Sequence, residues 1–290
     1  MEEEKKVYLG MAVDVIHRGH LTTIQEAAKL GKVTVGVLTD KAIASYKKLP
    51  FFDYNHRKLI VESIKGVSDT IPQESVDQTD NLRKLKPDYV VHGDDWREGV
   101  QKPFREKVIE VLKEWGGQLI EIPFIKDSSS TQIKKALKEI GTTPELRLKL
   151  LRRLLDSKKI VRVLEAHNGL TGLIVENTKA KDEKGYEKEF DAVWISSLTE
   201  ATAKGKPDIE LPDLSSRYNI LNDILESTTK PIIYDGDTGG HTEHFIHMLK
   251  TLERLGVSAV IIEDKNGLKR NSLFGTEVPQ QQEEISRFAE

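Results

Sequence analysis

The sequence has 290 residues, which is enough for two domains of ordinary size. Its 44 basic and 47 acidic side chains give a net charge of −3, so the chain has no bulk attraction to nucleic acid or to an anionic membrane. It contains no cysteine, which excludes a disulfide framework, a thiolate metal site and a cysteine nucleophile. The first residues do not read as a signal peptide, and no apolar run approaches the ~18 residues of a membrane span. We therefore expect a cytoplasmic enzyme or binding protein.

The first half of the sequence alternates apolar runs with amphipathic segments. We expect strands at residues 7–14, 33–38, 69–72, 89–92 and 118–122. We expect helices at residues 17–31, 57–65, 79–86, 103–115 and 131–140. Such alternation predicts a parallel, Rossmann-like sheet with covered faces, in which ligands bind beyond the carboxyl ends of the strands.

Two histidines stand where the first of these helices begins. His17 and His20 are three residues apart, so both imidazoles lie on one side of the first turn, and Gly19 between them lets a ligand approach the backbone. A helix N-terminus favours phosphate, and the imidazoles can donate hydrogen bonds as charge builds on phosphate oxygens. The simpler interpretation is a pair of surface histidines that cap a helix.

Four motifs share their order with a known family. They are GMAVDVIHRGH at residues 10–20, YNHRKLI at 54–60, HGDDW at 92–96 and SSSTQI at 128–133. This pattern resembles the HxGH nucleotidyltransferases, most closely the glycerol-3-phosphate cytidylyltransferases, over about residues 5–140. The resemblance implies CTP as co-substrate.

By that resemblance, His17 and His20 stabilise the transition state at the α-phosphate of CTP, and Lys47 or Lys48 neutralises the phosphates. The expected nucleotide-binding residues are Gly10, Asp14, Asp94, Trp96, Ser130 and Thr131. Of these, Asp14 organises the site, Thr131 holds the β- and γ-phosphates, and Asp94 and Trp96 border the acceptor and base pockets.

The sequence departs from this family at one position. The family usually carries an arginine ahead of the Ser/Thr motif, whereas Phe124 stands here with Lys126 nearby. This difference indicates an acceptor other than glycerol phosphate. It also leaves an alternative in which the domain binds a nucleotide for regulation without turnover.

A basic, leucine-rich segment joins the two halves. Leu146, Leu150, Leu151, Leu154 and Leu155 recur at helical spacing after a Gly-Thr-Thr-Pro break. We predict a first domain at 1–141, a linker helix at 142–159 and a second domain at 160–290.

The second half repeats the strand–helix alternation. We expect strands at 160–165, 191–196, 231–234 and 257–262, and helices at 170–177, 242–255 and part of 211–226. Polar residues follow each strand, as in a (β/α)₈ barrel with its active site at the carboxyl face of the strands. Such a barrel needs eight strands, so we expect an incomplete barrel and a fragment of a longer chain.

Three carboxylates fall at neighbouring strand ends in this half. Asp235, Asp237 and Glu263 offer the hard oxygen ligands that Mg²⁺ prefers. The alternative is that the Asp-Gly-Asp sequence simply makes a turn. The loop 265–272 that follows is rich in Lys, Asn and Ser, which suits an anion and can move.

The motifs EAHNGL at 165–170, DAVWISSL at 191–198, DGDTG at 235–239 and EDKNGLKRNS at 263–272 are similar to those of the phosphoenolpyruvate mutases of the isocitrate lyase superfamily. The resemblance implies that Asp235 ligates Mg²⁺ directly, with Asp208, Asp237 and Glu263 holding its waters. It places the pyruvate pocket at Trp194, Ser196, Ser197 and Leu198. A gating loop with Lys269, Asn271 and Ser272 would cover the phosphoryl group.

The implied reaction interconverts phosphoenolpyruvate and phosphonopyruvate. Its loose, metaphosphate-like transition state requires positioning and charge rather than a strong nucleophile. The carbon–carbon lyases of the superfamily use a loop cysteine, which this chain lacks. Phosphonopyruvate hydrolase remains the alternative, and asparagine at position 271 favours the mutase.

Together these expectations describe a bifunctional enzyme of phosphonate biosynthesis. It would form a carbon–phosphorus bond and transfer CMP to a small phosphonate or phosphate acceptor. We expect neither a nucleic-acid nor a membrane partner, and the superfamily resemblance favours a homo-oligomer.

Overall fold

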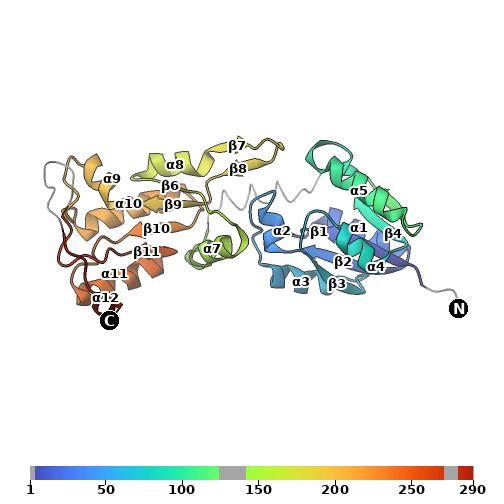
Figure 1. The fold of residues 1–290 in the computed structure, drawn as a ribbon, viewed down its shortest axis with the longest axis horizontal. Coiled ribbons are helices and arrows are strands. Elements are labelled where there is room, and N and C mark those ends of the chain that lie inside the picture. Colours follow the sequence, from blue (N-terminus) through green and yellow to red (C-terminus); the bar gives the residue numbers. More distant parts are fainter. Residues whose placement is uncertain (1–3, 124–141, 271–279, 290) are drawn as a thin grey trace. The chain divides into compact units, whose positions relative to one another are not determined.

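A computed structural model describes residues 4–123, 142–270 and 280–289. The chain divides into two compact units: Met1–Leu137 with Lys181–Glu187, and Lys138–Ala180 with Lys188–Glu290. Both units combine parallel sheets with helices (Figure 1). Within the described residues, no helix combines the length and the apolar character needed to cross a membrane.

The first unit is built on a five-stranded parallel sheet in the order β3-β2-β1-β4-β5. Its strands are β1 (Lys6–Met11), β2 (Lys32–Leu38), β3 (Asp69–Gln73), β4 (Tyr89–Gly93) and β5 (Gln118–Ile122). The chain adds strands to one side of β1 and then returns to its other side, so the topological switch point lies between β1 and β4. This order confirms the predicted Rossmann-like sheet. Pro72 lies in edge strand β3, where its missing N–H costs the sheet little.

Helices cover both faces of this sheet. They are α1 (Arg18–Ala28), α2 (Asp40–Ala44), α3 (Tyr54–Glu62), α4 (Thr79–Leu85) and α5 (Lys102–Leu112), with 3-10 turns η1 (Asp94–Trp96) and η2 (Gly99–Gln101). Side chains alternate along β1, so Val7 and Leu9 pack with residues of α1 and α3, while Tyr8 packs with residues of α4 and α5. Because both faces of the central strands are covered, β1 and β2 read as nearly continuous apolar runs.

The second unit contains a four-stranded parallel sheet in the order β11-β10-β9-β6. The strands are β6 (Val163–Glu165), β9 (Ala192–Ile195), β10 (Ile232–Asp235) and β11 (Ala259–Ile261). Neighbours in this sheet are also successive parallel strands of the chain. That order is consistent with part of a (β/α)₈ barrel, as predicted.

The helices of this unit are α7 (Pro144–Ser157), α8 (Gly169–Asn177), α9 (Ser197–Ala203), α10 (Leu214–Ser227), α11 (Thr242–Leu255) and α12 (Ile285–Ala289). Residues from α8, α10 and α11 pack with the strands around Tyr234. The leucine-rich segment forms α7, where Leu151 and Leu154 are buried and Arg147 donates hydrogen bonds to the Leu225 and Thr228 carbonyl oxygens. A two-stranded sheet joins β7 (Lys179–Lys181) to β8 (Glu187–Glu189).

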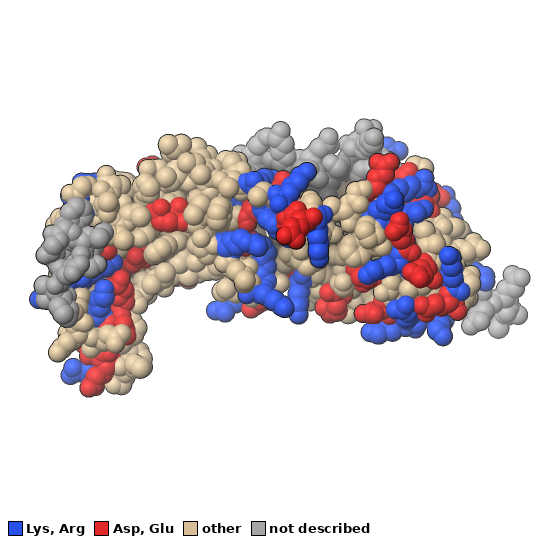
Figure 2. All heavy atoms as spheres, turned by 45° about the horizontal axis from the view of Figure 1, so that its top comes forward, with Lys and Arg blue, Asp and Glu red and all other residues tan. Residues whose placement is uncertain are grey.

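On the face seen in Figure 2, charged side chains are distributed differently over the two units. In Figure 2, basic and acidic side chains are interspersed over the first unit, whereas much of the visible surface of the second is uncharged. The exposed apolar side chains of the second unit include Leu170, Leu173 and Ile174 on α8. Contiguous exposed apolar surface of this kind is typical of interaction sites.

Two short helices and a two-stranded sheet were missing from the sequence prediction. Helix α2 has only five residues, and α9 (SLTEATA) has one large apolar side chain, so neither shows a readable apolar stripe. Strand β7 is Lys-Ala-Lys and β8 is Glu-Lys-Glu, so neither carries an apolar alternation. The predicted helix at 131–140 lies outside the described residues.

Candidate functional site

The predicted histidine pair sits at the start of α1, just beyond β1. His17 is the N-cap residue, and its Nδ1 accepts a hydrogen bond from the Gly19 N–H at 3.1 Å. The His20 Nδ1 accepts from the His17 N–H at 3.4 Å, and the two ring centroids are 3.9 Å apart. Because both Nδ1 atoms act as acceptors, the proton of each neutral imidazole is on Nε2. The pair therefore both caps the helix and keeps its Nε2–H donors for other partners.

The environment keeps both imidazoles neutral. Burial lowers the pKa of His17. Burial also lowers the pKa of His20, to about 4, and a second positive charge on His20 would be repelled by Lys47 and by a protonated His17. Neutral imidazoles can donate hydrogen bonds to phosphate oxygens at pH 7 without first losing a proton. They are suited to stabilise charge that increases during a reaction.

Lys47 supplies the positive charge near this pair. Burial lowers its pKa, while the Asp14 carboxylate acts in the opposite direction. Asp14 is itself buried and accepts a hydrogen bond from the Phe51 N–H. Lys48 is exposed, so the structure separates the two lysines that the sequence left as alternatives.

A cavity of about 330 Å³ opens beyond the carboxyl ends of the strands in the first unit. Gly10, His17, His20, Lys47 and Trp96, all candidate site residues, line it. Its other polar lining residues include Gln73, Gln78, Asp95 and Gln101. Asp94 is not among the lining residues, and its neighbour Asp95 takes that place. Ser130 and Thr131 lie outside the described residues, as do Phe124 and Lys126.

Trp96 is held in this cavity by Glu121, which sequence reasoning missed. The indole stacks on His92 with centroids 3.8 Å apart, and its Nε1–H donates to Glu121 Oε1 at 2.9 Å. Arg105 and Arg97 also donate to Glu121, and together with the indole they lower its pKa to about 2 despite burial. An isolated charged residue at the end of a predicted strand was the only signal for Glu121.

Another buried charge, Arg57, fixes the ends of β1 and β2. Its guanidinium donates to the Ala12 and Leu38 carbonyl oxygens and pairs with Asp40 at 2.7 Å. Its motif marked it in the sequence, but only the structure shows that it supports the loops that follow the two strands.

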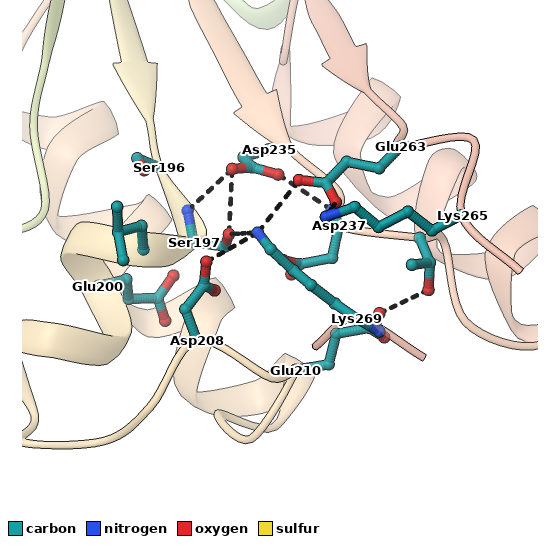
Figure 3. Close-up of polar contacts among 12 residues, drawn as sticks. Ser196, Ser197, Glu200, Asp208, Glu210, Asp235, Asp237, Glu263, Lys265 and Lys269 are labelled. Carbon is teal, nitrogen blue, oxygen red and sulfur yellow. Dashed lines mark hydrogen bonds and ion pairs between the residues drawn. The ribbon is translucent and has the colours of Figure 1, made fainter. Parts of the chain in front are cut away.

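The second unit brings its predicted residues together at the carboxyl ends of β9, β10 and β11 (Figure 3). Asp235 Oδ2 accepts hydrogen bonds from Ser197 N at 3.2 Å and from Ser197 Oγ at 3.0 Å. The Asp237 N–H donates to Asp235 Oδ1 at 3.0 Å, and Asp237 adopts a left-handed conformation with φ of 52°. Asp tolerates this conformation better than most residues because its side chain can bond the local backbone.

Lys269 points into the middle of this group of acids. Its Nζ lies 2.8 Å from Asp208, 3.1 Å from Asp237 and 3.2 Å from Glu263, and it donates to Ser197 Oγ at 2.9 Å (Figure 3). Burial opposes the charge, but Asp208 and Asp237 outweigh it and raise the pKa of Lys269. The ammonium group thus takes the position of a central cation among four oxygen donors.

Arg217, which was not predicted, shares Asp237 with Lys269 and also pairs with Glu200. Its Nε donates to Glu200 at 3.0 Å, one terminal nitrogen to Asp237 at 2.9 Å, and the other to the Asp235 carbonyl oxygen at 2.6 Å. The guanidinium lies 4.5 Å from the centroid of the Tyr234 ring. In the sequence, Arg217 occupies the apolar stripe of α10 with Leu221 and Ile224, and a charge in such a stripe is a signal for a buried pair.

The remaining predicted residues differ in their environment. Ser196 is buried, whereas Trp194 and Leu198 are each 37% exposed. Glu263 also pairs with Lys265, and the Lys269 N–H donates to Glu210 at 2.9 Å. Asn271 and Ser272 lie outside the described residues.

The acids fit a hard divalent cation in their chemistry, but the chain's own cations occupy their oxygens. Among the described residues, no three His, Cys, Asp or Glu side chains are arranged to hold a metal ion. Asp208, Asp235, Asp237 and Glu263 nevertheless supply the carboxylate oxygens that Mg²⁺ prefers. A metal ion would have to take over contacts that Lys269 now makes.

Comparisons with known proteins separate along the same division. Residues 11–136 match the family described as cytidylyltransferase-like, and residues 151–290 match the family described as phosphoenolpyruvate phosphomutase. Glycerol-3-phosphate cytidylyltransferase of Bacillus spizizenii is 33% identical over 133 residues, which cover 45% of this chain and 95% of that protein.

The relatives of the second unit include two phosphoenolpyruvate phosphomutases. Phosphoenolpyruvate phosphomutase of Tetrahymena pyriformis is 34% identical over 125 residues, which cover 43% of this chain. The matched segment spans 38% of the length of that protein. A solved phosphoenolpyruvate phosphomutase from Streptomyces platensis subsp. rosaceus aligns with 51% of this chain and 46% of its own, at 27% identity and a TM-score of 0.40.

Proposed function

Since the chain belongs to the cytidylyltransferase family and its residues 151–290 match the phosphoenolpyruvate phosphomutase family, we propose that it is a bifunctional enzyme of phosphonate biosynthesis. One activity would isomerise phosphoenolpyruvate to phosphonopyruvate. The other would transfer CMP from CTP to a phosphonate or phosphate acceptor.

The nucleotidyl transfer rests on one observation: two neutral imidazoles present Nε2–H donors at a helix start that lines a cavity. An acceptor oxygen would attack the α-phosphorus of CTP, and the bond to the departing pyrophosphate would break in line with it. His17 and His20 would donate to the α-phosphate oxygens, where charge increases, and Lys47 would balance that charge.

Pyrophosphate release tests this activity directly. The protein is incubated with CTP, Mg²⁺ and 2-aminoethylphosphonate, with glycerol phosphate as a second acceptor. We expect pyrophosphate and a CMP-linked product. CTP binding without pyrophosphate from any acceptor would instead support the regulatory, non-catalytic alternative.

The mutase activity is supported by the carboxylate group at the ends of β9, β10 and β11. Asp235 would bind Mg²⁺ directly, and Asp208, Asp237 and Glu263 would hold its waters. The bound ion would neutralise substrate oxygens and orient them. Trp194, Ser196, Ser197 and Leu198 would line the pocket for the pyruvate part of the substrate.

In this reaction, the bond from phosphorus to the enol oxygen breaks and a bond from phosphorus to C3 forms, as the enol becomes a ketone. The chain's task is to keep the phosphoryl group in place and to exclude water. After its ammonium group moves away from the acids, Lys269 would contact the phosphoryl group. Asn271 and Ser272 would cover the same group.

Phosphorus NMR separates the mutase from its alternative, phosphonopyruvate hydrolase. Phosphonopyruvate is added to the protein with Mg²⁺, and the products are followed by ³¹P signals. Phosphoenolpyruvate is the expected product, whereas free phosphate would identify a hydrolase. We also propose that the chain is a homo-oligomer, which the exposed apolar side chains of α8 support.

A further inference from the structure

Gln78 is a buried polar residue whose carboxamide oxygen has no hydrogen-bond donor within the described part of the chain. The residue is 4% exposed, and its Oε1 accepts no hydrogen bond from any described residue. It is the N-cap residue of α4, yet its side chain makes no capping hydrogen bond. A buried acceptor without a donor destabilises the folded protein, so such an atom needs an explanation.

The neighbouring Gln73 shows what a satisfied carboxamide looks like at the same place. Gln73 Oε1 accepts from the Tyr8 hydroxyl at 2.6 Å, and its Nε2 donates to the Ser75 carbonyl oxygen at 3.0 Å. Both carboxamide oxygens crowd Gly10, where an added Cβ would lie 2.6 Å from Gln73 Oε1 and 2.9 Å from Gln78 Oε1. The glycine therefore makes room for two acceptors, of which only one has a donor among the described residues.

Gln78 lines the same cavity as the histidine pair. The lining also includes Val76, Trp96 and Phe104, which offer apolar contact to a short carbon linker. The switch point between β1 and β4 is where a nucleotide is expected, whereas the β3–α4 connection brings Gln78 to β1 from the side of β2 and β3. This topology places Gln78 on the acceptor side of the cavity rather than on the nucleotide side.

We propose that Gln78 Oε1 receives a hydrogen bond from the end of the acceptor that is remote from its phosphate or phosphonate, and so selects acceptors that carry a donor there. This inference rests on the proposed cytidylyl transfer. The class of acceptor is a small phosphonate or phosphate with a hydroxyl or ammonium group on a short linker. A carboxamide oxygen accepts from both groups, so the chemistry they share defines the site.

Three acceptors with the same two-carbon chain test the proposal: 2-aminoethylphosphonate, 2-hydroxyethylphosphonate and ethylphosphonate, which lacks the donor. Their binding is measured by calorimetry in the presence of Mg²⁺ and α,β-methylene CTP, which cannot react at the α-phosphate. We expect at least one donor-bearing acceptor to bind about tenfold more tightly than ethylphosphonate, the order of one net hydrogen bond. Equal binding of all three, or binding of none, would overturn the proposal.

Variants then assign the preference to Gln78. Gln78→Leu should remove the preference and leave the affinities for ethylphosphonate and the CTP analogue unchanged. Gln118→Leu, at an exposed position in β5, should keep the preference. A preference that survives Gln78→Leu, or a Gln78→Leu variant that loses only the CTP analogue, would show that Gln78 does not read the acceptor. Gln78→Met serves the same purpose if the leucine variant does not fold.

Two further readings complete the test. In Gln78→Glu, tighter binding of the aminoethyl compound relative to the hydroxyethyl compound identifies an ammonium donor, and the reverse identifies a hydroxyl. Pyrophosphate release is followed in parallel with CTP. A binding preference without pyrophosphate would contradict the proposed transferase but keep the role of Gln78, whereas pyrophosphate without a preference would contradict the role of Gln78 alone.

Discussion

The two units prepare for charged ligands in opposite ways. In the first, neutral imidazoles and one buried lysine face a cavity, so the chain presents donors that a phosphate can use at once. In the second, the acids are already paired with Lys269 and Arg217. The first site therefore needs only its ligand, while the second must exchange an internal cation for an external one. Several carboxylates can lie close together without a metal ion if the chain supplies its own positive charge.

The largest effect should be on the stability of the second unit, when Arg217 is removed. Arg217→Leu leaves Glu200 and Asp237 without their guanidinium, and loss of one partner from a buried pair costs about 3–5 kcal/mol. Urea unfolding of the variant should show this loss of unfolding free energy. Arg152→Leu, at an exposed position in α7, is the matched control and should change stability by less than about 0.5 kcal/mol. Equal stability of the two variants would mean that Arg217 is not needed to hold the acids.

In the first unit, we expect a large loss in the rate of nucleotidyl transfer when either histidine is replaced. His17→Asn and His20→Asn each remove an Nε2–H donor from the cavity, and loss of one such donor typically slows a reaction by about 10²–10³-fold. Pyrophosphate release from CTP measures the change, with circular dichroism as a check on folding. His244→Asn in α11 should leave the rate unchanged. Near-normal rates in both His17→Asn and His20→Asn would show that the two histidines only cap helix α1 and take no part in the reaction.

Acid should weaken the first unit through His20. Its pKa is about 4 in the folded protein and near 6.5 when unfolded, so the unfolded state binds the proton first. The stability from this group is complete above pH 6.5 and is lost as pH falls towards 4, by up to about 3 kcal/mol for a shift of this size. The free energy of unfolding, measured with urea between pH 7.5 and 4, should fall less steeply with decreasing pH in His20→Asn than in the unchanged protein. Identical slopes would contradict a neutral, buried His20.

The smallest effect should appear where the chain's cation and Mg²⁺ compete. Lys269→Met removes the ammonium from Asp208, Asp237 and Glu263 and should raise Mg²⁺ affinity roughly tenfold, which corresponds to about 1.4 kcal/mol. Calorimetric titration with Mg²⁺ gives the affinity without turnover, and Lys250→Met at an exposed position in α11 is the control. Weaker Mg²⁺ binding in Lys269→Met would show that the lysine supports the metal site instead of competing for it.

Local sequence patterns were sufficient for most of the fold. The strand at 118–122 and the helix at 79–86 were predicted within a residue or so of β5 and α4, because strong periodicity fixes such elements. The prediction for 160–165 began three residues before β6, since Ile160 is apolar but exposed. Helix α2 is too short to show periodicity, and α9 has only Leu198 as a large apolar side chain.

Motifs also located both candidate sites, but not the residues that connect them to the fold. The histidine spacing and the carboxylates at strand ends identified the groups that would touch ligands. Arg217, Glu121 and Gln78 carry no motif, because their roles depend on what packs against them. Lys269 was predicted on a loop over the substrate, and in the structure its ammonium group lies among the acids.

The sequence by itself determined the two α/β units, the order of their motifs and the chemical types of the candidate residues. These properties are local, since periodicity and spacing act over a few residues. Only the tertiary structure decided which charges are paired: Arg217 with Glu200 and Asp237, and Lys269 with three acids that lie far apart along the chain. It also decided that Gln73 is satisfied while Gln78 is not. Burial and pairing depend on neighbours brought together by folding, and no local pattern records them.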